Sequence, residues 1–92
     1  MLYVRRLLWD DWNMAHIARH SVTQEEVEAV CHGAPVVQEG HSGRSLVFGP
    51  SAAGRMLTVV LEPLPEDEAV YYVVTARPAS RRERAVYARE RE

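Results

Sequence analysis

The spacing of apolar residues changes along the chain, and each spacing predicts a different kind of element. Residues 3–9 place apolar side chains on both sides of an extended segment, and Arg5 and Arg6 within it are typical of an edge strand. Between residues 12 and 32 the apolar positions recur every three or four residues, the period of an amphipathic helix. From residue 36 to 77 the pattern shifts to short apolar runs, which indicate strands.

Local capping signals predict where the helices begin. Asp10 or Asp11 caps a first helix over about residues 12–20, and a T-x-x-E capping box begins a second helix after Thr23. A glycine followed closely by a proline ends that second helix. An S-x-x-E box at Ser80 begins the last helix, which runs almost to the C-terminus.

The apolar runs predict four further strands with short connections, which imply an antiparallel sheet. These strands are Val36–Glu39, Arg44–Phe48, Arg55–Glu62 and Ala69–Arg77. Together the elements predict one small α+β domain over residues 1–92, in the order βααββββα. Arg55 and Arg77 then lie at strand ends, and simple alternation places Arg77 on the same face as Tyr71 and Val73.

Composition is that of an ordinary single-domain protein. The chain has 92 residues, of which 47% are hydrophobic and 26% charged, and this is enough for one core. The lone Cys31 excludes an internal disulfide and a cysteine zinc site, which favours a reducing compartment. No run has the length of a membrane span, and Arg5 and Arg6 interrupt any signal peptide. We therefore expect a cytoplasmic protein without membrane association.

All eleven basic residues are arginine, although the net charge is only −2. Six of them fall within the last sixteen residues, whereas four acidic residues crowd positions 62–68. Two interpretations stay open: a general bias of the coding sequence toward arginine, and a use of its forked donors to bind phosphate. The uneven distribution indicates that a chain of nearly neutral charge carries a basic face.

Three blocks of residues, in a fixed order, span nearly the whole chain. The first reads W-D-x-x-N-x-x-H-I-A-R-H-x-V followed by E-E-V, over residues 9–27. The second consists of two glycine–arginine turns, Gly43–Arg44 and Gly54–Arg55. The third is a strand ending in T-A-R-x-A and a helix carrying E-R-x-x-Y, over residues 75–87. In this order and at these separations, the blocks resemble the BrnT toxin family, the ribonuclease half of a bacterial type II toxin–antitoxin pair.

The resemblance implies a RelE-like fold, in which an antiparallel sheet presents a concave face to RNA, and metal-independent cleavage of that RNA. It also implies inhibition of translation, no cofactor, and a cognate BrnA-like antitoxin that binds DNA. A homodimer or a toxin–antitoxin hetero-oligomer is the expected assembly. The chain departs from the family where members often carry lysine and it has Arg19, and where they often carry glutamate and it has Arg44.

Metal-free RNA cleavage needs a base for the ribose 2′-hydroxyl, a proton donor for the leaving oxygen, and fixed positive charge beside the phosphate. Arg55 and Arg77 are the first candidates for the positive charge, because arginine never loses its charge near neutral pH. The alternative is that both form ordinary salt bridges with Glu62 or Glu83.

His16 and His20 are the candidate acid and base, since imidazole titrates near neutral pH. Their spacing of four places them on one side of the first helix, in line with Trp12. Two alternatives stay open: His16 packs against Trp9 while His20 caps the helix, or the pair binds a metal, for which the block offers no convincing third ligand.

The remaining candidates are ranked lower. Tyr87 is a candidate proton donor or stacking residue, and Arg84, Arg44 and Arg19 are candidate RNA contacts. Glu83 is a second-rank base, because the capping box already explains it. The sequence thus predicts an endoribonuclease toxin; the alternatives are a non-catalytic binding module of the same fold and a metal-dependent hydrolase.

Overall fold

Each helix begins at a side chain that accepts a hydrogen bond from the first turn. In the computed structural model, which describes residues 2–91, the helices are α1 (Asp11–Ala18), α2 (Gln24–His32) and α3 (Arg81–Glu90). The capping boxes predicted at Thr23 and Ser80 are confirmed, with both reciprocal hydrogen bonds in place. Asp10, rather than Asp11, caps α1 and exchanges its two bonds with Asn13. Helix starts therefore follow from residues within one turn of one another.

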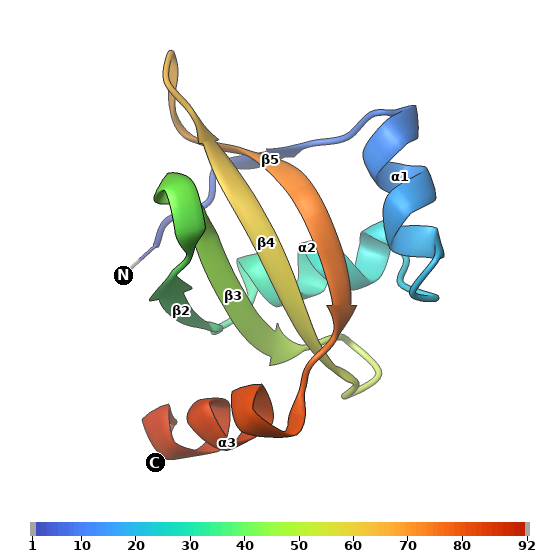
Figure 1. The fold of residues 1–92 in the computed structure, drawn as a ribbon, viewed down its shortest axis with the longest axis vertical. Helices are drawn as coiled ribbons and strands as arrows, with labels where there is room; N and C mark the ends of the chain where they lie inside the picture. The colour runs from blue at the N-terminus through green and yellow to red at the C-terminus, as the bar shows by residue number, and fades with distance from the viewer. Residues whose placement is uncertain (1, 92) are drawn as a thin grey trace.

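Five strands form one sheet in the order β1-β5-β4-β3-β2 (Figure 1). They are β1 (Arg6–Leu8), β2 (Val36–Glu39), β3 (Ser45–Pro50), β4 (Met56–Leu64) and β5 (Asp67–Pro78), with a short 3-10 helix η1 (His41–Gly43) between β2 and β3. The prediction of a wholly antiparallel sheet is wrong, because β1 runs parallel to β5. A parallel pair needs a long connection, and the rest of the domain provides it. β1 is an edge strand, as its arginines predict.

The sheet has one face against helices and one that is largely open. Figure 1 shows α2 behind the sheet, α1 beside β5, and α3 at the end of the sheet away from the β4–β5 hairpin. The face toward the viewer, here named the front face, carries Leu46, Phe48, Thr58, Val60, Thr75 and Arg77. α3 covers the end of that face, where Phe48, Thr58 and Val86 are buried.

The core lies between the sheet and helices α1 and α2. Its residues alternate along the strands, as half-buried strands require. The sheet contributes Val47, Leu57, Val59, Leu61, Val73 and Ala76, and the helices contribute Ile17, Val27, Val30 and Cys31. Burial raises the pKa of the Cys31 thiol to about 12, so this cysteine is a packing residue without nucleophilic character.

A β-bulge in β5 changes which residues share a face. Val60 pairs with Thr75 but Leu61 pairs with Val73, so Val74 is the extra residue. Arg77 and Thr75 consequently lie on the front face while Val73 lies in the core. The prediction that Arg77 shares a face with Tyr71 and Val73 is wrong, because it assumed an unbroken alternation.

A buried amide attaches α1 to the sheet. The Asn13 side chain is fully buried, and its Nδ2 donates to the carbonyl oxygens of Leu8 and Val73, each at 3.0 Å. Its Oδ1 accepts from the backbone N–H of Asp10 at 2.9 Å. One side chain thus satisfies three backbone groups, in β1, in β5 and at the helix cap; the bond to Val73 is buried and the other two are partly buried.

Replacing Asn13 by alanine is expected to lower the free energy of unfolding by about 2–4 kcal/mol, because it leaves buried backbone groups without partners. Thr23→Ala removes a capping side chain that is exposed, and about 1 kcal/mol is expected for it. Urea unfolding followed by circular dichroism measures both. Equal losses for the two variants would contradict the attachment role of Asn13.

Candidate active site at the end of helix α1

Three aromatic rings stack along one side of α1. The Trp12 and His16 rings are nearly parallel, at 9°, with centroids 5.1 Å apart. The His20 ring meets His16 edge-on, with centroids 6.0 Å apart. His20 lies in the turn after the helix, where its N–H donates to the carbonyl of Ile17. The predicted alignment of Trp12, His16 and His20 is confirmed, and His16 stacks on Trp12 rather than on Trp9.

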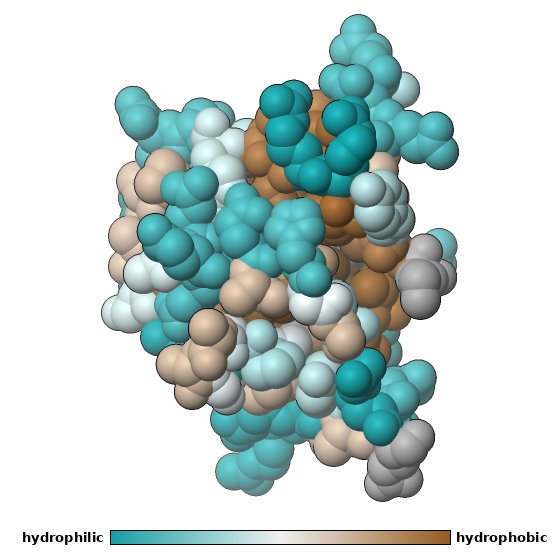
Figure 2. Space-filling view, turned by 180° about the vertical axis from the view of Figure 1, so that it is seen from behind, coloured by the Kyte–Doolittle hydropathy of each residue, from teal (hydrophilic) through white to brown (hydrophobic). Residues whose placement is uncertain are grey.

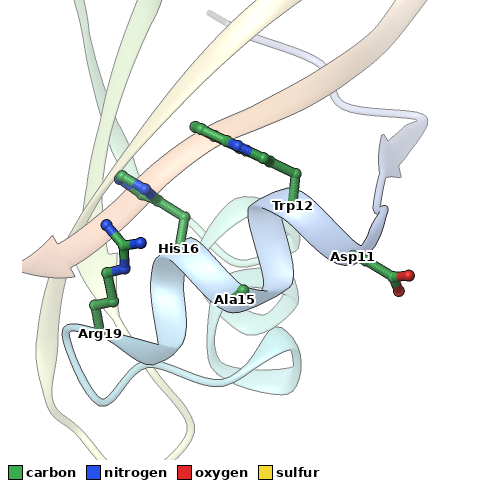
Figure 3. Close-up of a pocket in the computed structure, with 5 residues that line it drawn as sticks. All are labelled: Asp11, Trp12, Ala15, His16 and Arg19. Atoms are coloured by element: carbon green, nitrogen blue, oxygen red, sulfur yellow. The ribbon is translucent and has the colours of Figure 1, made fainter.

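A shallow hollow of about 420 Å³ runs along the same helix. It is lined by Asp11, Trp12, Ala15, His16 and Arg19. Figure 3 shows Trp12, His16 and Arg19 projecting to the same side of the helix, while Asp11 points away from them. The small Ala15 side chain leaves the space between these longer groups open. An indole, an imidazole and a guanidinium therefore border one hollow.

Arg55 reaches the turn after α1 from a distant part of the chain. It precedes β4, and its Nη2 donates to the carbonyl oxygen of His20 in a long bond of 3.4 Å. Its nearest carboxylate oxygen, on Glu26 of α2, lies 4.0 Å from Nε. The buried Nε has no hydrogen-bond partner among residues 2–91. The Arg55 side chain is thus held at the backbone carbonyl of His20, and since Nε is buried, its terminal Nη groups are the donors that a ligand would meet.

The other two candidate arginines near strand ends each pair closely with a carboxylate. Arg44 pairs with Glu62 through Nε at 2.9 Å. Arg77 makes a two-pronged pair with Glu83, at 2.8 Å for both contacts. The salt-bridge interpretation is confirmed for Arg77, whose partner is Glu83. It is wrong for Arg55, whose nearest carboxylate belongs to Glu26. Among the three arginines, Arg55 has the most distant carboxylate partner, at 4.0 Å against 2.9 Å for Arg44 and 2.8 Å for Arg77.

Arg55 and Arg77 do not meet. Arg77 pairs across the sheet with Thr58 on the front face. Arg55 contacts His20 and Glu26, which belong to the helix side of the sheet. Although both arginines lie near strand ends as predicted, they are on opposite faces and do not converge on one phosphate.

Glu83 acts as a structural anchor for α3. One of its oxygens, Oε1, accepts hydrogen bonds from the Thr58 hydroxyl, from Arg77 Nη1 and from the Ser80 N–H, each at 2.8 Å. The bond from Arg77 is the main reason that the pKa of Glu83 falls from 4.5 to about 2, with the Ser80 and Thr58 bonds adding to it. The same pair raises the pKa of Arg77. A carboxylate with so low a pKa is a poor general base near neutral pH.

The remaining predicted site residues lie away from α1. Tyr87 is half-buried on α3, where the Arg91 guanidinium lies 5.9 Å from the centre of its ring. Arg84 is exposed on the same helix. In Figure 1, α3 and α1 occupy different sides of the domain, so neither residue joins the histidines. Arg44 follows η1 and faces Glu62.

Two elements of the α1 group were not predicted as site features. The sequence predicts Trp12 only as one residue of a helical stripe. Its spacing of four from His16 is the signal that indicates contact between the two rings. The contact between Arg55 and His20 joins residues 35 positions apart and left no sequence signal.

A second hollow is larger but chemically poorer. It has a volume of about 700 Å³ and is lined by Leu2, Gly33, Ala34, Pro35, Val37, Glu39 and Arg91. Its lining has no histidine, and its one carboxylate is that of Glu39. Seen from behind, the molecule shows hydrophobic residues uncovered along one side and hydrophilic residues over most of the rest (Figure 2).

Within residues 2–91, no three histidine, cysteine, aspartate or glutamate side chains converge in a way that suits a metal ion. In the same range, no helix is long and apolar enough to cross a membrane. Comparison with protein-family models, with curated proteins and with solved structures finds no match to this chain.

The Glu83 anchor predicts a specific loss of stability in acid. Because its pKa is about 2 in the folded protein and 4.5 when unpaired, its contribution is complete above about pH 5 and is lost as the pH falls toward 2. The shift corresponds to about 3 kcal/mol. Urea unfolding between pH 7 and pH 2 should show this decline in the parent protein and a much smaller one in Glu83→Gln.

The matched control is Glu62→Gln, which removes the exposed partner of Arg44. Its carboxylate is 49% exposed, so about 0–1 kcal/mol and little pH dependence are expected. If Glu62→Gln and Glu83→Gln change the acid profile equally, the anchor role of Glu83 is wrong.

Proposed function

We propose that this protein is a metal-independent endoribonuclease, acting as the toxin of a toxin–antitoxin pair, with its active site at the end of α1. Two observations support the proposal. The motif blocks resemble those of BrnT toxins over nearly the whole chain. The α1 group of Trp12, His16, Arg19, His20 and Arg55 brings together the side-chain types that metal-free RNA cleavage needs.

The chemistry assigns one imidazole to each proton transfer. One ring of the His16–His20 pair takes the proton of the ribose 2′-hydroxyl, and the 2′-oxygen forms a bond to phosphorus. The bond from phosphorus to the 5′-oxygen breaks, and the other ring, protonated, gives that oxygen its proton. The products are a 2′,3′-cyclic phosphate and a free 5′-hydroxyl. This transfer reaction balances without an oxidant, a metal or a cofactor.

Arg55 supplies the fixed positive charge, and its incomplete pairing is the observation that carries the proposal. The Arg55 side chain is 38% exposed and its nearest carboxylate oxygen lies 4.0 Å away, so its terminal Nη groups can stabilise the extra negative charge of a five-coordinate phosphorus. Arg19 borders the same hollow and adds a second positive group. Arg77 has a different task, since its pair with Glu83 holds α3 on the sheet.

Charge is distributed so that RNA approaches away from the β4–β5 hairpin. Exposed acidic residues occupy that hairpin, at Glu66, Asp67 and Glu68. Exposed arginines line α3 at the other end of the sheet, namely Arg81, Arg82, Arg84, Arg89 and Arg91 (Figure 1). A polyanion is repelled by the first region and attracted by the second. The acidic hairpin therefore disfavours an approach of RNA from that end of the sheet, and a cognate antitoxin would neutralise the toxin by covering the α1 group.

Cleavage of an end-labelled single-stranded RNA by purified protein in excess chelator tests the proposal. We expect His16→Ala and His20→Ala each to lower the rate by about 10²-fold or more. Arg55→Ala should lower it by about 10²- to 10³-fold, because a donor to the charged transition state is lost. Products carrying 2′,3′-cyclic phosphate are expected, and gel mobility after phosphatase treatment identifies them.

Two controls keep the result specific. His41→Ala removes an exposed imidazole in η1 and should leave the rate unchanged. Arg44→Gln should have little effect if the site is at α1, and a large effect if RNA is cut on the front face beside Glu62. Folded protein that binds RNA in a salt-dependent way but never cuts it would identify the binding module instead.

A further inference from the structure

Trp12 is the one large aromatic side chain of α1, and the fold does not use most of its surface. Its side chain is 63% exposed, although exposed indole surface contributes nothing to the core. The other tryptophan, Trp9, packs against the core and donates its Nε1–H to Glu28 at 2.8 Å. The contrast leaves the exposure of Trp12 without a structural explanation.

The Trp12 ring is nevertheless held in a defined orientation. One face lies against the His16 ring at an angle of 9°, and His16 in turn contacts His20. With one face covered and 63% of the residue exposed, the uncovered area is the opposite face and the ring edges. Figure 3 shows Trp12 at one end of the row of side chains formed by Trp12, His16 and Arg19. A ring oriented in advance loses little freedom when another flat ring stacks on it.

We infer that the free face of Trp12 binds an unpaired nucleobase next to the cleaved bond, so that the substrate is single-stranded RNA. This inference rests on the proposed function. A base on the outer face extends the column base–Trp12–His16 by one ring. Its sugar–phosphate then runs along the hollow toward His16, Arg19 and His20, where the chemistry takes place.

Duplex RNA does not fit this arrangement. Both faces of a paired base are covered by its neighbours in the helix, so stacking on Trp12 requires the base to leave the stack. Stacking on an aromatic side chain tolerates any base, because every base has a flat π-face. The arrangement therefore favours single-stranded RNA over duplex RNA, and it does not discriminate between one base and another.

Tryptophan fluorescence tests the binding step without relying on cleavage. The chain has two tryptophans, so Trp9→Phe leaves Trp12 as the only one. Titration of this variant with an uncleavable single-stranded oligonucleotide, carrying 2′-deoxyribose throughout, should quench its emission. The same oligonucleotide annealed to its complement should quench it at least about tenfold more weakly. Equal quenching by single strand and duplex overturns the inference.

Substitutions at Trp12 separate stacking from simple apolar contact. Trp12→Ala should weaken binding of the single strand by about ten- to hundredfold, and Trp12→Phe should recover most of that loss. Trp12→Leu keeps an apolar side chain without a π-face and should behave like alanine. Recovery by leucine equal to that by phenylalanine overturns stacking. Since the residue is exposed, an unchanged urea midpoint is expected for all three variants.

The binding and cleavage outcomes are independent. If RNA is not cut but Trp12 emission is quenched by single strands, the proposed catalysis fails and the base-binding surface stands. If RNA is cut and Trp12→Ala cuts single-stranded and duplex RNA with unchanged rates, the inference fails and the catalysis stands. An abasic residue placed beside the cleavage site should slow the parent protein and leave Trp12→Ala unaffected.

Discussion

The position of α1 depends on the amide of Asn13, and the candidate site depends on the position of α1. That amide bridges the end of β1, β5 and the helix cap, with its buried bond going to the carbonyl oxygen of Val73. Asn13 faces inward, while Trp12, one residue before it, is 63% exposed and stacks on His16 along the flank of the same helix. A polar contact in the core thereby orients a row of aromatic rings toward solvent.

Three candidate arginines, Arg77, Arg44 and Arg55, differ in how closely each pairs with a carboxylate. Glu83 engages Arg77 through both of its oxygens, and the pair holds α3 across the end of β4 and β5. Glu62 occupies Arg44 on the front face. Arg55 has only a carboxylate at 4.0 Å and one long hydrogen bond. Charge alone does not distinguish these residues, because all three are permanently positive; the difference lies in how completely each is satisfied.

Several features of the site were predictable because they are local. The Thr23 and Ser80 capping boxes and the spacing of Trp12 and His16 each involve residues three or four positions apart, and the helix geometry determines their contacts. The assignment of phosphate-binding arginines was less successful. It relied on strand alternation, which a single bulge at Val74 reverses, and on pairing with acidic residues that lie far away in sequence.

The sequence by itself determined the elements of this protein: where its helices start, which runs become strands, and which side of α1 carries the rings. These properties depend on neighbours within about one turn or along one strand, so they can be read from spacing. Only the tertiary structure decided that β1 lies parallel to β5, that Arg55 and Arg77 occupy opposite faces, and that Arg55 meets His20. Those outcomes depend on contacts between segments distant in sequence, whose register no local pattern specifies.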